Sequence, residues 1–294
     1  MKSIFILVSS LILAGCSAWT ASEENEKTRD YIPVQDYTGQ GYDLPNGDKT
    51  DQIAEEHAEE IETAVVRFFK EEYKTDVEVH NMVGAEGEVS VFVESKGKPH
   101  FYSFAIVPID TRNQEVLTDE VWSQEYQVEE AIMSGLYAWI KEDEFDKLND
   151  YIASLTTEYP ITGLQKEALE NVGAGYYMTR YYNVPVGGGK LEHLLKAYLT
   201  NPERTKEEWT RLLGTEPIDP NMVTITLQLY MEKPNIPPDN VIFNKIVEDI
   251  ENMTGIPAGT YGIYLHDNEI NQSSGQNNKP NTLEKSLPDP IIKN

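Results

Sequence analysis

The pattern of apolar and polar positions predicts an amphipathic helix over residues 50–73. Apolar residues recur there at helical spacing, and the glutamates fall largely on the other side. A buried face of this kind must pack against another element of the fold. The apolar positions are Ile53, Ile61, Val65, Phe68 and Phe69.

Three strands are expected next, over residues 77–80, 89–94 and 101–109. In the first two, valines at odd positions alternate with polar or aromatic residues at even positions, and the third is a more continuous apolar run. Turn-like segments at 84–87 and 97–99 separate them. The preceding helix with this antiparallel meander forms a compact α-β-β-β unit, in which the helix covers one sheet face.

The rest of the chain alternates between helical periodicity and two strand patterns. We expect the strand, helix and strand after residue 223 to form one unit. The expected elements are helical segments over 117–172 with a break near Pro160, helices over 191–199 and 205–213, a strand over 223–231, a helix from Pro237 to about Met253, and a strand over 261–266.

These elements predict an α+β domain over residues 50–267, in one body or in two lobes. In it, a helix with an antiparallel three-strand meander is followed by a helix-rich region with a strand-helix-strand element. Residues 16–49 are acidic and poor in apolar periodicity, which indicates a tether, part of which docks on the domain. Residues 268–294 are rich in Asn, Gln, Ser and Pro, and we expect a disordered tail.

The N-terminus has the order of a bacterial lipoprotein signal. Lys2 precedes an apolar stretch that ends in Leu13-Ala14-Gly15-Cys16. The apolar run from Ile4 to Ala14 would span only about 16 Å as a helix, whereas a bilayer core is roughly 30 Å thick. We therefore expect residues 1–15 to be a signal peptide and Cys16 to be lipidated. The alternative is an ordinary secretory signal with a free cysteine near the cleavage site.

Lipidation would place the protein on the extracytoplasmic face of the cell membrane. One acyl chain binds a bilayer only marginally, but the two chains of a diacylglyceryl group (palmitate-type lipid) are enough for stable anchoring. The membrane, reached through the lipid on Cys16, is thus the first expected partner. Since Cys16 is the chain's one cysteine, no disulfide can form within the mature protein.

The charge excludes some partners. The chain has 24 basic and 50 acidic residues, a formal net charge of −26. Such a surface repels nucleic acid, so we expect no nucleic-acid partner. The same charge repels anionic head groups and keeps an exposed protein soluble.

No motif identifies a catalytic residue, a metal site or a cofactor. The five histidines have no metal-ligand spacing, although His80 and His100 lie on neighbouring expected strands and could be close in space. Gly187-Gly188-Gly189-Lys190 resembles a phosphate loop but lacks its first glycine and its Ser or Thr, so we expect a flexible loop. The remaining histidines are His57, His193 and His266.

The segment 173–182 is the strongest candidate for a ligand-binding surface. Aromatic rings stack on sugars or peptides, and an arginine can bind a carboxylate with two hydrogen bonds. The competing interpretation is that many of these rings belong to the core. The candidate binding residues are Tyr176, Tyr177, Arg180, Tyr181 and Tyr182.

Four stretches resemble a family of uncharacterised lipoproteins from low-GC Gram-positive bacteria, described only as a domain of unknown function. They are residues 33–42, 79–85, 91–95 and 99–102, and the resemblance covers most of the mature chain. It implies a membrane-anchored surface lipoprotein and supplies no catalytic residues. It also implies that residues 33–42 belong to the domain, which shortens the tether to about Ser17–Ile32.

We therefore expect a lipid-anchored envelope lipoprotein that binds wall material, a peptide or another protein and is not an enzyme. A cell-envelope hydrolase with an unrecognised active site is one alternative. A substrate-capture lipoprotein of a transporter is the other.

Overall fold

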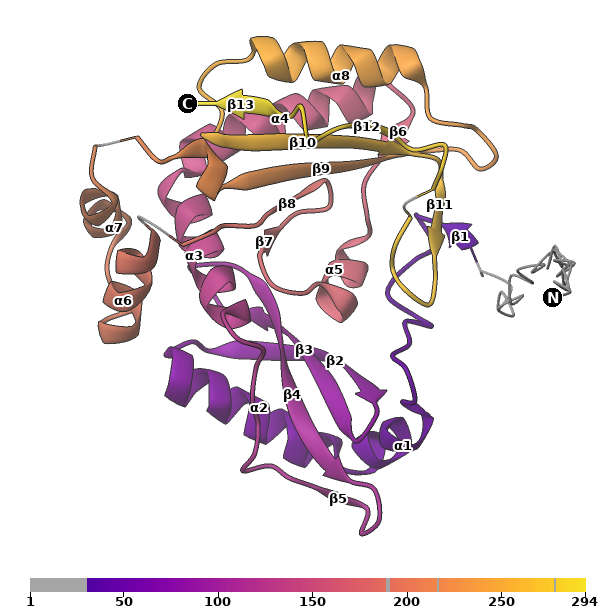
Figure 1. Cartoon of the computed structure of the whole chain (residues 1–294), viewed down its shortest axis with the longest axis vertical. Coiled ribbons are helices and arrows are strands. Elements are labelled where there is room, and N and C mark those ends of the chain that lie inside the picture. The colour runs from indigo at the N-terminus through magenta and orange to yellow at the C-terminus, as the bar shows by residue number, and fades with distance from the viewer. Residues whose placement is uncertain (1–30, 189–190, 216, 278) are drawn as a thin grey trace, which may run out of the picture.

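The computed structural model describes residues 31–188, 191–215, 217–277 and 279–294 (Figure 1). It has an α+β fold, as the periodicity predicts. Two main sheets lie at opposite ends of the molecule, and the helix α3 runs between them (Figure 1). A separate two-stranded sheet pairs β1 (Tyr31–Pro33) with β11 (Glu269–Asn271).

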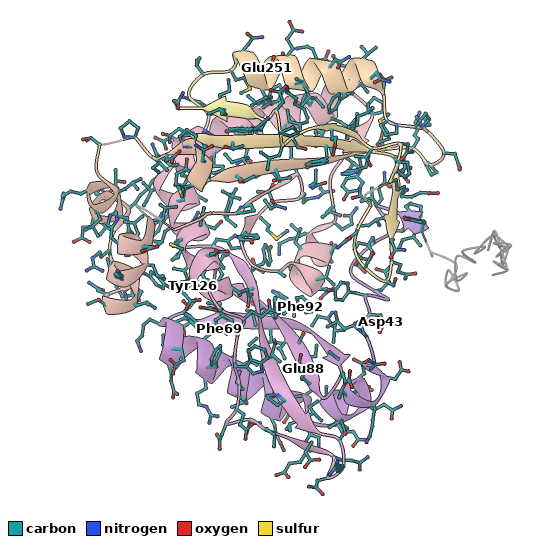
Figure 2. The ribbon with its side chains drawn as sticks, viewed as in Figure 1. Asp43, Phe69, Glu88, Phe92, Tyr126 and Glu251 are labelled. Atoms are coloured by element: carbon teal, nitrogen blue, oxygen red, sulfur yellow. The ribbon has the colours of Figure 1, made fainter. Side chains whose placement is uncertain are left out.

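The first main sheet confirms the predicted meander. Its strands run in the order β2 (Val77–Ala85), β3 (Glu88–Ser95), β4 (Tyr102–Asp110) and β5 (Glu115–Val116), all antiparallel. The predicted first helix is interrupted at His57, which separates α1 (Asp48–Glu56) from α2 (Ala58–Tyr73). The buried Phe69 belongs to α2, and Phe92 on β3 contacts the ring of Tyr42 (Figure 2).

The second main sheet contains the predicted strand-helix-strand element. Strand β9 (Thr224–Met231) pairs in parallel with β10 (Gly259–His266), and α8 (Asn240–Asn252) connects them and covers the sheet (Figure 1). Asp239 caps α8 by accepting hydrogen bonds from two backbone N–H groups. Three short strands extend this sheet in antiparallel pairs. β6 (Ile161–Thr162) and β8 (Tyr182–Val184) pair with β9, and β7 (Tyr177–Met178) pairs with β8.

Helices fill the space beside and between the sheets, and most match the predicted ones. The exception is residues 117–126, which are not helical, because the backbone of Trp122 exchanges two hydrogen bonds with Ile106 on β4. The remaining elements are α3 (Gln127–Ile140), α4 (Glu142–Glu158), α5 (Lys166–Val172), α6 (Glu192–Thr200), α7 (Lys206–Leu213) and the short 3-10 helix η2 (Pro220–Met222).

The prediction of a disordered C-terminal tail is wrong. Strand β11 (Glu269–Asn271) pairs with β1 (Tyr31–Pro33), and both β12 (Leu283–Lys285) and β13 (Ile291–Lys293) pair with β10. The tail supplies partners to the backbone groups of an otherwise open sheet edge. The polar composition of the tail did not indicate strands. Part of this polarity is used inside the fold, since the side chain of Asn268 donates to the backbone carbonyls of Met231 and Glu232.

The N-terminal boundary agrees with the shortened tether that the family resemblance implied. Residues 31–42 lie on the domain: β1 pairs with β11, and Val34 and Tyr37 are buried. The signal peptide, Cys16 and the tether up to residue 30 lie outside the described residues.

One continuous hydrophobic core links the two main sheets. It includes Phe69 and Val91 from the first sheet region and Ile225 and Ile263 from the second. Among the residues that the structure describes, no helix has both the length and the apolar character needed to cross a membrane.

Candidate functional site

A β-bulge in β2 directs His80 toward the sheet face that points to α5. The register skips this residue: Val79 pairs with Val93, and Asn81 already pairs with Phe92. A bulge inserts one unpaired residue and re-aims its side chain. Both residues at the bulge make contacts on this face, since His80 contacts Glu94 and Asn81 donates to the carbonyl of Asn171 at the end of α5.

The carboxylate of Glu94 contacts two imidazole rings. Nε2 of His80 lies 3.0 Å from Oε2 of Glu94, and Nε2 of His100 lies 2.7 Å from Oε1. Strands β3 and β4 place Glu94 opposite Tyr102. The ring of Tyr102 meets the ring of His100 edge to face, with centroids 5.2 Å apart.

The loop between β3 and β4 holds His100 in place. Ser95 accepts a hydrogen bond from the backbone N–H of Phe101 and donates one to the carbonyl of Pro99. Gly135 on α3 permits a close approach, because a Cβ atom at this position would lie 2.7 Å from the carbonyl oxygen of His100. Helix α3 therefore packs directly against the loop that carries the second histidine.

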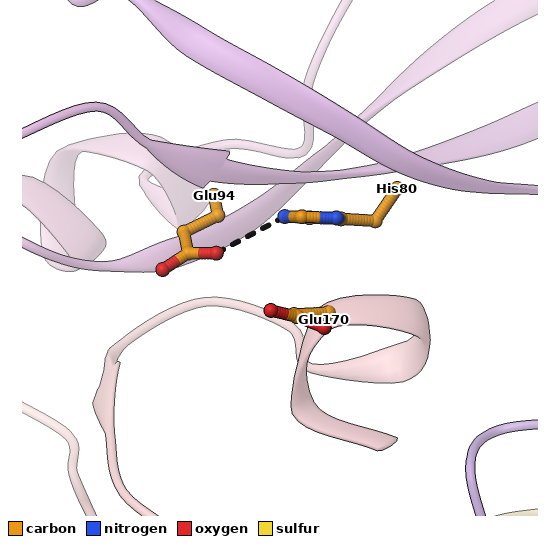
Figure 3. Close-up of side chains that lie close together, drawn as sticks. All are labelled: His80, Glu94 and Glu170. Carbon is orange, nitrogen blue, oxygen red and sulfur yellow. Dashed lines mark hydrogen bonds and ion pairs between the residues drawn. The ribbon is translucent and has the colours of Figure 1, made fainter. Parts of the chain in front are cut away.

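Glu170 on α5 faces His80 and Glu94 from across the gap between sheet and helix (Figure 3). One ligand atom from each of these three side chains lies within 4.8 Å of the other two. The side chains are 15%, 20% and 18% exposed for His80, Glu94 and Glu170. Lys166, one turn earlier on α5, forms an ion pair with Glu170 and is itself 63% exposed.

The electrostatics keep Glu94 charged and Tyr102 neutral. Burial alone would raise the pKa of Glu94, but the hydrogen bonds from His100 and His80 outweigh it, and the pKa lies below its ordinary value. Burial and the nearby carboxylates of Glu94 and Glu170 raise the pKa of Tyr102, so its phenol stays protonated. The site thus presents carboxylates, imidazole nitrogens and a neutral phenol on one partly open face.

This set of groups suits the binding of a cation. Imidazole nitrogen and carboxylate oxygen are the ligands of many zinc and other transition-metal sites. Within the described part of the chain, His80, Glu94 and Glu170 are the one cluster of three potential metal-ligand side chains whose ligand atoms lie close together. Alternation along the strands is a partial signal, since it places residues 78, 80 and 94 away from the valine face. Nothing in the sequence connects Glu170 to them.

The tyrosine-rich segment is divided between core and surface. Tyr182 is 2% exposed, stacks on Phe145 and donates to Asn149. Tyr177 packs against the core beside Tyr182, and its ring meets that of His100 with centroids 6.1 Å apart. Of the five candidate residues, Tyr177 therefore borders the His80–Glu94–His100 cluster.

The other three candidates are partly buried and engaged locally. Arg180 donates from Nε to the carbonyl of Leu164 and lies over the ring of Tyr181. Tyr181 also packs against the core, and the backbone carbonyl of Tyr176 accepts from the N–H of Tyr102. The five side chains do not gather into one exposed aromatic face, so a binding role for them stays a prediction.

The remaining sequence candidates are separate from this cluster. His57 contacts Glu60, and His193 contacts the carbonyl of Leu212. His266 is buried among strands of the second sheet. Gly187 and Gly188 precede α6, whereas Gly189 and Lys190 lie outside the described residues.

A groove between α2 and residues 118–123 was not expected from the sequence. It has a volume of about 560 Å³ and is lined by aromatic and charged residues, including Arg67, Phe68, Tyr73 and Trp122. Trp122 is 43% exposed, and Arg67 is paired with Asp119 at 3.0 Å. An exposed indole beside charged groups is typical of a surface that binds sugars or peptides.

The fold is that of an α+β protein with two main sheets and a parallel strand-helix-strand element. The chain belongs to the family described as a protein of unknown function (DUF1672), whose model matches residues 24–293. The resemblance to an uncharacterised family is thereby confirmed.

A solved protein of the same family has the same fold. The crystal structure of a DUF1672 family protein from Staphylococcus aureus matches with a TM-score of 0.72 and 18% sequence identity, covering 90% of this chain and 98% of that one. No curated protein matches the chain.

Proposed function

We propose that this protein is a lipid-anchored binding protein on the extracytoplasmic face of the bacterial cell membrane. The observation that carries the proposal is the order of Lys2, an apolar stretch and Leu13-Ala14-Gly15-Cys16 at the N-terminus. Lipid on Cys16 anchors the chain, and the part of the domain that the structure describes, from Tyr31 onward, follows a short polar segment of sequence.

Binding is favoured over turnover by the character of the groove beside α2. Phe68, Tyr73 and Trp122 supply aromatic rings to its lining, and Arg67 and Asp119 supply charged groups. This combination fits a glycan or a peptide of the cell wall. The domain would hold such a ligand near the membrane without acting on it chemically.

The anchor is tested by the Cys16→Ser variant of the full chain, expressed in a Gram-positive host and labelled with a fatty acid. The wild-type protein should carry label and sediment with membranes. The variant should carry no label, and acyl chains should no longer hold it in the membrane fraction. Ser17→Ala, one residue further along, is the matched control and should behave as wild type. Equal labelling of wild type and Cys16→Ser would refute lipidation at this cysteine.

The groove is tested with Trp122→Ala against Tyr126→Ala. Both residues are exposed aromatics, at 43% and 62%, but only Trp122 lines the groove. Retention on purified cell wall should fall at least about tenfold for Trp122→Ala, since truncated tryptophan anchors cost about 2 kcal/mol or more. Tyr126→Ala should bind as wild type.

Two other results would redirect this assignment. Release of soluble wall fragments by the purified protein would favour the hydrolase alternative. Stabilisation by a small solute, together with no retention on wall, would favour substrate capture for a transporter.

A further inference from the structure

We propose that His80, Glu94 and Glu170 bind a divalent transition-metal cation of the zinc class. This site is distinct from the groove beside α2, and it does not depend on the lipid anchor or on wall binding. Figure 3 shows its three side chains converging from β2, β3 and α5.

The chemistry of the ligand set selects the class of cation. His80 offers an imidazole nitrogen, and the two glutamates offer carboxylate oxygens. Zinc and similar first-row ions bind such mixed nitrogen and oxygen sets. Calcium and magnesium prefer sets made of oxygen alone, so the imidazole argues against them.

The distances are close to those of a formed site. Ligands at about 2.0–2.2 Å from a tetrahedral zinc ion lie roughly 3.4 Å apart. Nε2 of His80 and Oε2 of Glu94 are 3.0 Å apart in a hydrogen bond that the ion would replace, with the imidazole proton then on Nδ1, and all three ligand atoms lie within 4.8 Å of one another. Rotation of the Glu170 side chain toward the other two would close the remaining gap.

The residue that opposes this rotation is easily displaced. Lys166 holds Glu170 in an ion pair, but its own side chain is 63% exposed. Exposed ion pairs contribute little to stability, about 0–1 kcal/mol. A divalent cation between two carboxylates would replace that single charge with a stronger one and leave Lys166 in solvent.

His100 orients the ligand carboxylate. Its Nε2 contacts Oε1 of Glu94 at 2.7 Å, which leaves Oε2 facing His80 and the ion. Hydrogen bonds to ligands of this kind fix their orientation, and their loss typically lowers metal affinity by about 10–100-fold. His100 is therefore a positioning residue.

The ion would connect parts of the chain that are far apart in sequence. His80 and Glu94 belong to neighbouring strands of the first main sheet, whereas Glu170 follows β6 of the second. A bound cation would thus cross-link α5 to the β2–β3 hairpin.

The test is titration of the purified, metal-free full chain with Zn²⁺ alone, followed by calorimetry. One ion should bind per chain at neutral pH. His80→Ala and Glu170→Gln should each lower the affinity at least about tenfold, and His100→Ala by about 10–100-fold. The matched controls are Glu167→Gln on the exposed side of α5 and His193→Ala on α6, which should bind as wild type.

Circular dichroism of every variant separates lost ligands from lost folding. Gln is nearly isosteric with Glu, and the ion pair it would remove has the 63% exposed Lys166 as its partner, so Glu170→Gln should keep the fold even where His80→Ala does not. X-ray absorption of the zinc complex should show nitrogen and oxygen ligands. Absence of stoichiometric zinc binding by the wild type would overturn the proposal, as would unchanged affinity in a folded Glu170→Gln variant.

Discussion

Histidines occupy two contrasting regions of this molecule. His266 lies in the second main sheet at 1% exposure, and both ring nitrogens contact neutral side chains: Nδ1 contacts Thr282 at 3.0 Å and Nε2 contacts Gln228 at 2.7 Å. In the first sheet, the side chains of His80 and His100 are 15% and 27% exposed and share the carboxylate of Glu94.

The contrast shows what an imidazole is used for in each place. Burial lowers the pKa of His266 to about 4, so at neutral pH it is an uncharged hydrogen-bonding part of the core. Its ring stacks parallel to that of Tyr264, with centroids 6.1 Å apart. Glu94, by contrast, is 20% exposed, and its pKa is held below the ordinary value by the imidazoles that contact it, so it keeps its charge.

The largest expected effect is loss of the buried imidazole. His266→Ala would create a cavity and would leave the polar groups of Gln228 and Thr282 without their hydrogen-bond partner. The free energy of unfolding should therefore fall by about 3 kcal/mol. Urea denaturation measures this. His193→Ala, at an exposed position of α6, should change the free energy of unfolding by no more than about 0.5 kcal/mol. Similar losses in the two variants would remove the distinction between a core histidine and a surface one.

The pH dependence of stability should also come from His266. Its folded-state pKa of about 4 is below the ordinary 6.5, so the unfolded chain takes up a proton first as the pH falls. The stability contributed by neutral His266 is therefore fully present above pH 6.5 and is lost as the pH falls from 6.5 to 4. At 1.36 kcal/mol per pKa unit, the free energy of unfolding should fall by about 2 kcal/mol from pH 7 to pH 5. His266→Gln, which cannot titrate, should flatten the curve in this window. An unchanged slope would assign the effect to other groups.

The smallest expected effect falls on the open cluster. Glu94→Gln keeps one acceptor oxygen for a histidine and removes the charge, so without metal the loss of stability should be about 1 kcal/mol. Glu78→Gln is the matched control, because Glu78 pairs directly with Glu94 in the sheet and is exposed. A loss as large as that of His266→Ala would mean that the cluster is structural.

Much of the fold was predictable because it depends on local periodicity. Alternating valines marked β2 and β3, and the Pro237-Pro238-Asp239 sequence marked the start of α8. Two regions were not predictable. Trp122 is held by hydrogen bonds to β4 rather than by a helix, and the polar tail forms strands on β10. Both depend on partners that are distant in sequence.

The candidate site shows the same limit at the level of single residues. Alternation placed Glu94 and His80 away from the valine face, and the proximity of His80 and His100 was an expectation from neighbouring strands. The structure adds that they meet at Glu94, on opposite sides of β3. The bulge at His80 and the approach of Glu170 carry no local sequence signature.

The sequence by itself determined the class of fold, because side-chain periodicity is a property of each segment. It also contains the N-terminal pattern on which the proposed anchor rests, since that signal would be recognised as a linear segment. Tertiary structure alone decided which charged groups meet. Hydrogen bonding at a sheet edge gave the polar tail its strands, and the packing of α5 against the first sheet brought Glu170 to His80 and Glu94. These contacts form between residues far apart in the chain, so their positions follow only from the folded whole.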